Sequence, residues 1–117
     1  MATAREMFDA RMLASKYGPV GRVAAGYRTA GFQVKVLDKT GEEPVSFIAW
    51  KKGARFAVRV VIKSESVSAN TVKALIEEAK KNDARPVLVL YGRGPKIEKD
   101  ALEEAKSQGV KVRRFRA

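Results

Sequence analysis

Three cations, Arg55, Arg59 and Lys63, fall on one face of a stretch in which side chains alternate between two faces. The opposite face of this stretch is apolar and consists of Phe56, Val58, Val60 and Ile62. A guanidinium can hold two phosphate oxygens at once, and an ammonium supplies a compact positive charge. The chemistry that this cationic face suggests is contact with a phosphate group.

Four acids flank the same stretch, namely Asp38, Glu42, Glu43 and Glu65. Carboxylate oxygens are the ligands that Mg²⁺ prefers, and a bound Mg²⁺ can activate water for attack on a phosphodiester. The simpler interpretation assigns these acids to turns and loops at strand ends, because Asp38-Lys39-Thr40-Gly41 has the composition of a turn. Both interpretations remain open at this point.

The cations lie in the second half of a predicted β-hairpin over residues 45–63, with its turn at Lys51-Lys52-Gly53-Ala54. A period of two in polarity is typical of a strand with one well-buried face. We therefore expect the apolar face of the second strand to be buried, and this long strand to lie centrally in its sheet.

The rest of the chain predicts a single α/β domain. We expect helices over 3–16, 20–30, 68–82 and 97–108, and further strands over 32–37, 87–91 and 110–115. Ser68 is the expected N-cap of the third helix, whose buried stripe consists of Val72, Leu75, Ile76 and Ala79. A meander followed by crossover helices predicts a mixed sheet of about five strands flanked by helices. Residues 64–66 read as a polar connection.

Charge is the strongest compositional signal. The 117 residues contain 24 Lys and Arg against 13 Asp and Glu, a net charge of +11, and the isoelectric point is about 10.2. Such an excess favours a polyanionic partner, most commonly nucleic acid. The alternative is the charge-rich surface of a thermophile, which the absence of Cys and His and the scarcity of Asn and Gln would also suit. A thermophile surface normally balances its charges, so we favour the nucleic acid.

Composition excludes several classes of function. The sequence has no cysteine and no histidine, which excludes disulfides, zinc–thiolate sites, cysteine nucleophiles and Ser-His-Asp triads. It has no run of about 18 apolar residues, so we expect no membrane segment. The N-terminus is charged and lacks the apolar stretch of a signal peptide, which favours a cytoplasmic location.

Three segments, Gly31-Phe32-Gln33-Val34, Val45 to Ala49 and Phe56 to Val61, resemble the PD-(D/E)xK nuclease superfamily. Within it they are similar to the archaeal Holliday-junction resolvases, which have a "GF-x-V" strand, a "P-D-I-I-A" strand and an "A-V-E-V-K" strand. Pro86 before an apolar strand also fits. The resemblance implies a restriction-endonuclease-like fold, with an extra N-terminal helix over 1–17, a core over 18–91, and a C-terminal helix and strand over 96–115.

The residues that carry catalysis in that superfamily are replaced. The metal-binding Asp falls at Ser46, the Glu of the last motif at Arg59, its Lys at Val61, and the helix-one Glu near Val20 or Gly21. The resemblance therefore implies no catalytic residues and no metal cofactor. Mg²⁺ enters only under the alternative of an active nuclease, in which the acids have migrated and Lys63 takes the place of the motif Lys.

Our leading hypothesis is that catalysis is lost while the contacts with DNA phosphates are kept. The expected nucleic-acid-binding residues are Lys51, Lys52, Arg55, Arg59, Lys63, Arg28, Lys35, Lys39, Arg113 and Arg114. An ion pair with a nearby Glu is the alternative for Arg59, and a solvated turn is the alternative for the hairpin cations. The basic tail that includes Arg116 is a second phosphate patch or a frayed end. The loop 92–96 lacks the spacing of a Walker loop, and we expect none there.

We therefore expect a catalytically inactive nuclease-fold protein that binds duplex or branched DNA through its backbone. By resemblance it acts as a homodimer or beside an active relative. RNA is a further possible partner. The remaining alternatives are an active Mg²⁺-dependent junction resolvase and a non-catalytic subunit that recognises an acidic protein.

Overall fold

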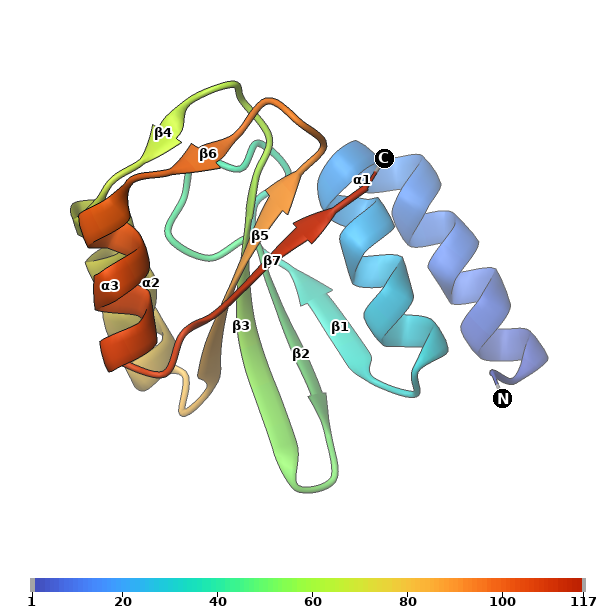
Figure 1. The fold of residues 1–117 in the computed structure, drawn as a ribbon. Helices are drawn as coiled ribbons and strands as arrows, with labels where there is room; N and C mark the ends of the chain where they lie inside the picture. The colour runs from blue at the N-terminus through green and yellow to red at the C-terminus, as the bar shows by residue number, and fades with distance from the viewer. Residues whose placement is uncertain (1, 117) are drawn as a thin grey trace.

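The computed structural model describes residues 2–116, which form three layers (Figure 1). The central sheet has the strand order β1-β2-β3-β5-β7. Its strands are β1 (Gln33–Val36), β2 (Phe47–Lys51), β3 (Ala54–Val61), β5 (Arg85–Tyr91) and β7 (Lys111–Phe115). Strands β1, β2 and β3 pair antiparallel, whereas β3, β5 and β7 pair parallel. The predicted mixed sheet of five strands, with β3 at its centre, is confirmed.

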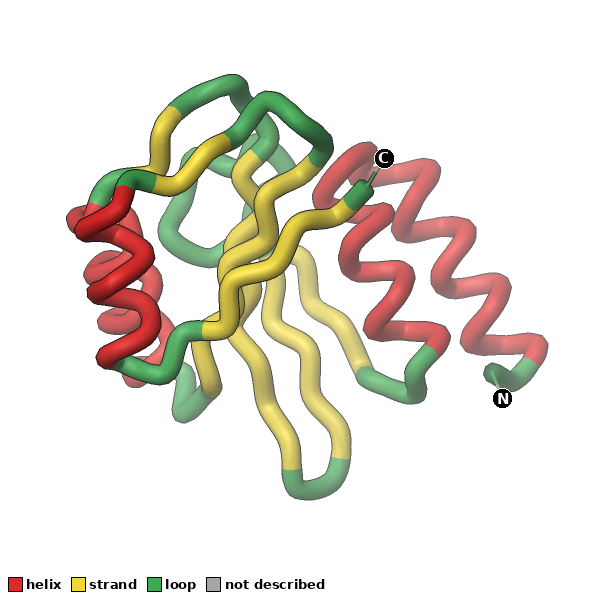
Figure 2. The backbone as a smooth tube through the Cα atoms, in the orientation of Figure 1, coloured by secondary structure: helices red, strands yellow, loops and turns green. Residues whose placement is uncertain are grey.

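Helix α1 (Ala4–Thr29) packs on one face of the sheet, and α2 (Ala69–Lys81) and α3 (Lys99–Ser107) cover the other. Gly18 interrupts α1 with a non-helical backbone (φ 58°, ψ −134°), and Pro19 follows it. The two segments of α1 lie side by side as an antiparallel pair (Figure 2). They correspond to the two helices predicted on either side of Tyr17-Gly18-Pro19.

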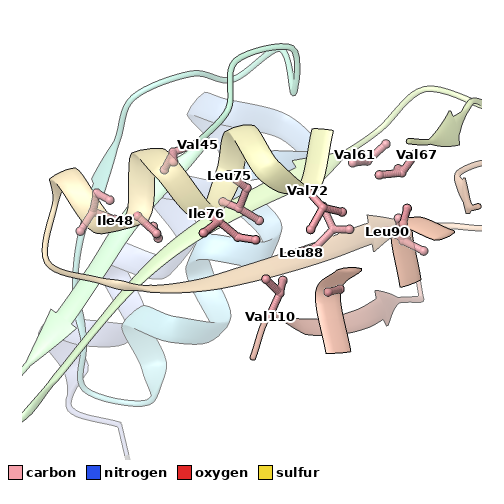
Figure 3. Close-up of a cluster of buried hydrophobic side chains, with 14 residues drawn as sticks. Val45, Ile48, Val61, Val67, Val72, Leu75, Ile76, Leu88, Leu90 and Val110 are labelled. Carbon is pink, nitrogen blue, oxygen red and sulfur yellow. The ribbon is translucent and has the colours of Figure 1, made fainter. Parts of the chain in front are cut away.

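The cluster between the sheet and the helices α2 and α3 is the larger part of the core (Figure 3). Ser68 caps α2 by accepting the N–H of Thr71, as predicted. The buried residues of α2 are Val72, Leu75, Ile76 and Ala79, the four expected from the helical period. A second cluster lies under the C-terminal segment of α1, where Tyr27 packs edge-on against Phe32 and Phe47.

The expectation that β3 has a single well-buried face is wrong. Val58 and Val60 lie under α1, but Ala57 and Val61 are equally buried on the opposite face, against α2. Arg59 lies between them and is only 9% exposed. The alternation in sequence reflects the strand correctly, but tertiary packing covers both of its faces.

Two local predictions also need correction. Ser66–Val67 forms a short strand, β4, which pairs parallel with β6 (Lys96–Ile97). The polar connection over 64–66 therefore ends in a strand, and α3 begins at Lys99 rather than at residue 97. Pairs of two-residue strands carry too little periodicity to be recognised in a sequence. Among residues 2–116, no helix has both the length and the apolar composition needed to cross a membrane.

Candidate nucleic-acid interface

Ser46 lies where β2 separates from β3. The last paired residues of the two strands are Phe47 and Val58. Beyond this pair, the hydroxyl of Ser46 accepts a hydrogen bond from the backbone N–H of Val60 at 3.0 Å. The backbone N–H of Ser46 donates to the carbonyl of Val58 at 2.8 Å. The side chain is fully buried. Ser46 thus satisfies a backbone donor that the strand ladder leaves unpaired, because buried N–H groups need a partner.

Arg59 is buried close to this point. Its Nη2 donates to the carbonyl of Gly41 at 3.3 Å, and its Nε has no hydrogen-bond partner among residues 2–116. Burial lowers the pKa of its guanidinium, an effect that the charges of Glu65, Asp38 and Glu43 partly offset. No carboxylate of the described residues lies within ion-pair distance of it. Together with Glu42, Lys63 and Glu65, Arg59 lines a cavity of about 220 Å³.

The other two positions that the resemblance aligns with catalytic residues carry no side chain that could bind a metal. Val61 is 1% exposed and packs in the apolar core. Gly21 lies at the contact between the two segments of α1, where an added Cβ would stand 1.9 Å from the carbonyl oxygen of Leu13. The helix-one Glu of the superfamily therefore has no room at Gly21, and Val20 beside it is fully buried.

The acids Asp38 and Glu42, close to the cavity at Arg59, make contacts within the loop 38–44 and between this loop and Lys63. Asp38 accepts hydrogen bonds from Thr40, Glu42 and Glu43. Partial burial alone would raise the pKa of Asp38, but these hydrogen bonds outweigh it and lower the pKa below its usual value. Glu42 pairs with Lys63, and this contact raises the pKa of the Lys63 ammonium. Within residues 2–116 no three acids come together to form a metal site.

The hairpin cations Lys51, Lys52 and Arg55 are exposed. The ammonium of Lys51 lies 4.4 Å from the centre of the Phe32 ring, and the guanidinium of Arg55 donates to the carbonyl of Asn82 at 3.2 Å. A shallow cleft of about 380 Å³ is lined by Lys51, Arg55 and Arg85, together with the acid Asp83. Sequence reasoning missed Arg85; the signal was a cation at the exposed start of an otherwise apolar strand.

The remaining cations do not form one surface with the hairpin. Arg28 joins the two segments of α1 by donating to Asp9 from Nε and Nη2, at 3.1 and 3.0 Å. Lys35 and Lys39 are exposed on β1 and in the loop that follows it. Arg113 and Arg114 lie on the edge strand β7. The sequence-predicted residues are therefore spread over both ends of the sheet, with the hairpin turn at one end of Figure 1 and the carboxyl ends of β5 and β7 at the other.

Residues 21–114 match the family described as restriction endonuclease. The chain belongs to this family. No curated protein matches the chain. The matched segment runs from the second segment of α1 into β7 and contains the central sheet except for Phe115, the last residue of β7. Membership in the restriction endonuclease family confirms the superfamily resemblance and the α/β fold, and it suggests interaction with nucleic acid.

Proposed function

We propose that this member of the restriction endonuclease family binds DNA through the phosphate backbone and does not cleave it. The observation that carries the proposal is the buried guanidinium of Arg59 at the position where the superfamily places a metal-binding Glu. A positive charge at that position opposes the binding of a divalent cation. Mg²⁺ also needs several oxygen ligands, and the Ser46 hydroxyl is engaged by Val60.

The charge distribution supports backbone binding. The net charge is +11, and no acid occurs in the segments 18–37, 84–97 and 105–117. The hairpin turn protrudes from the sheet, and Lys51, Lys52 and Arg55 are exposed on it. Lys51, Arg55 and Arg85 line a cleft in which Asp83 is the one acid among the described residues. Contacts of this type recognise phosphates rather than bases, so they give weak sequence preference and strong salt dependence.

Arg59 and Arg28 do not belong to this proposed interface. Arg59 is buried and donates to a backbone carbonyl, and Arg28 is held by Asp9 and Phe32. Assembly as a homodimer, or beside an active relative, remains part of the proposal. Met7, Phe8 and Met12 on the first segment of α1 are each about half exposed and provide apolar surface for it.

The experiment uses labelled linear duplex and four-way-junction DNA with Mg²⁺ or Mn²⁺, and each sample is read for both binding and strand cleavage. The proposal expects salt-sensitive binding of intact DNA. Cleavage that a chelator abolishes would establish the active nuclease instead. Absence of both would favour an acidic protein as the partner. Parallel samples with RNA duplex determine whether DNA is preferred.

A charge-reversal variant locates the interface. K51E/K52E removes two exposed hairpin cations, and K73E/K106E makes the same charge change on α2 and α3. We expect K51E/K52E to bind DNA at least tenfold more weakly than K73E/K106E, because each lost phosphate contact costs roughly a factor of ten near 0.1 M salt. Equal affinities of the two variants would show that the hairpin is not the interface.

A further inference from the structure

Three arginines gather at the carboxyl ends of β5 and β7. Arg93, Arg114 and Arg116, with Gly92, line a pocket of about 750 Å³, larger than the cavity at Arg59. No acid lines it within the described part of the chain. It forms because β5 and β7 are parallel neighbours, so that the loop after β5 lies next to the carboxyl end of β7 (Figure 1).

The strand ends that carry these arginines are held in place by several contacts. Arg114 donates to the carbonyls of Gly92 and Pro95, at 2.6 and 2.9 Å. The N–H of Gly92 donates to the carbonyl of Phe115 at 2.8 Å, and the rings of Tyr91 and Phe115 stack 5.2 Å apart. Arg114 is therefore a positioning residue, which fixes the loop relative to β7.

The other two arginines are available to a ligand. Arg93 and Arg116 are exposed, and neither guanidinium makes a hydrogen bond or an ion pair with another residue in 2–116. Two exposed guanidinium groups that line one pocket, with no carboxylate among its lining residues in 2–116, are well suited to bind a phosphate anion. The carboxyl ends of parallel strands are also the usual location of ligand sites in open α/β sheets.

The pocket lies beside the cavity at Arg59. Gly94, in the loop between Arg93 and Pro95, packs so closely on Ser64 that an added Cβ would stand 2.3 Å from its hydroxyl oxygen. Ser64 directly follows Lys63, which lines the cavity at Arg59. A DNA strand that passes Lys63 can therefore continue toward Arg93 and Arg116.

We propose that Arg93 and Arg116 clamp a backbone phosphate of the bound DNA, with Arg114 holding the loop that presents Arg93. This inference rests on the proposed function and assigns it a second contact surface, at the end of the sheet opposite the hairpin. Unlike a Walker loop, the site binds through side chains rather than through a glycine-rich backbone. A free phosphate offers the same chemistry, and the test separates the two sources.

The test compares R93A/R116A with K73A/K106A, which removes the same charge from α2 and α3. Fluorescence anisotropy gives the affinity for a labelled duplex between about 50 mM and about 200 mM salt. Because the two arginines clamp one phosphate, we expect R93A/R116A to lower the slope of log K against log salt by about 1 and to weaken binding about tenfold. The control double variant should retain the wild-type slope. Circular dichroism and thermal unfolding verify that both variants are folded.

If the slope of log K against log salt for R93A/R116A equals that of the wild type, the phosphate clamp at this pocket is wrong. The proposed function would not be contradicted by that result. A wild-type protein that does not bind DNA would overturn both. The last measurement is titration calorimetry of the wild-type protein with inorganic phosphate at matched ionic strength. We expect that low millimolar phosphate does not saturate the protein. Tight binding of inorganic phosphate that R93A/R116A abolishes would make this a small-anion site and contradict the clamp on DNA.

Discussion

The hydroxyl oxygen of Ser46 lies 3.0 Å from the backbone nitrogen of Val60 and accepts a hydrogen bond from it. This contact joins the position at which the superfamily resemblance expects a metal-binding Asp to the strand that carries Arg59. Ser46 thus has a structural role of its own, at the point where β2 separates from β3.

Replacing Ser46 with Ala should destabilise the protein by about 1–3 kcal/mol, because it leaves the buried N–H of Val60 without a partner. Urea unfolding monitored by circular dichroism measures the change. Ser107→Ala serves as a control, since that hydroxyl donates to the Glu104 carbonyl at the exposed end of α3. A cost for Ser46→Ala as small as that of the control would refute the assigned role.

Replacing Gly21 with Ala should separate the two segments of α1. The added Cβ meets the Leu13 carbonyl at 1.9 Å, and overpacking of this kind typically costs about 1–3 kcal/mol. Gly26→Ala is the matched control, because it has no neighbour within 4 Å and should gain up to about 1 kcal/mol from helix propensity. Both changes are read from the unfolding free energy. A gain for Gly21→Ala would mean that the segments do not pack as described.

Replacing Asp38 with Asn should make stability less sensitive to acid. The hydrogen bonds that lower the pKa of Asp38 stabilise the folded state above the ordinary carboxyl pKa of about 3.9, and this contribution disappears as pH falls through the lower, folded-state pKa. The unfolding free energies of wild type and Asp38→Asn should therefore differ most near neutral pH and converge at acidic pH. Glu103→Gln on α3 is the control. A difference that stays constant down to acidic pH would contradict the role of the charged carboxylate.

Replacing Arg59 with Met should be tolerated. The change removes a buried Nε that has no partner and keeps most of the side-chain volume, so the unfolding free energy should stay within about 1 kcal/mol of wild type or rise. Arg59→Ala should cost more, because it leaves a cavity. DNA affinity should be unchanged in Arg59→Met. A tenfold loss of affinity would show that Arg59 reaches a phosphate in the complex.

The elements of the fold were predictable because their signals are local. Ser68 and the apolar period of α2 define that helix, and the turn of the hairpin needs the positive φ of 79° that Gly53 adopts. The apolar run before Tyr91 indicated a strand covered on both faces, and β5 is buried in this way.

The environment of the site residues was less predictable because it depends on distant segments. The loop that contains Gly41 folds over Arg59, and nothing in the alternation of β3 reveals that cover. The pocket of Arg93 and Arg116 depends on β5 and β7 being parallel neighbours. The assignment of the cations to nucleic-acid binding stays a prediction, and their division between the two ends of the sheet is a property of the fold.

The most direct test of the central claim follows wild-type protein on one labelled duplex with Mg²⁺ present, from about 50 mM to about 200 mM salt. Each sample is measured for binding by anisotropy and is then run on a denaturing gel. The account predicts affinity that falls steeply with salt while every strand keeps its full length. Shortened strands that disappear when a chelator is added would contradict it, because the positions of Ser46, Arg59 and Val61 would then not describe the catalytic centre.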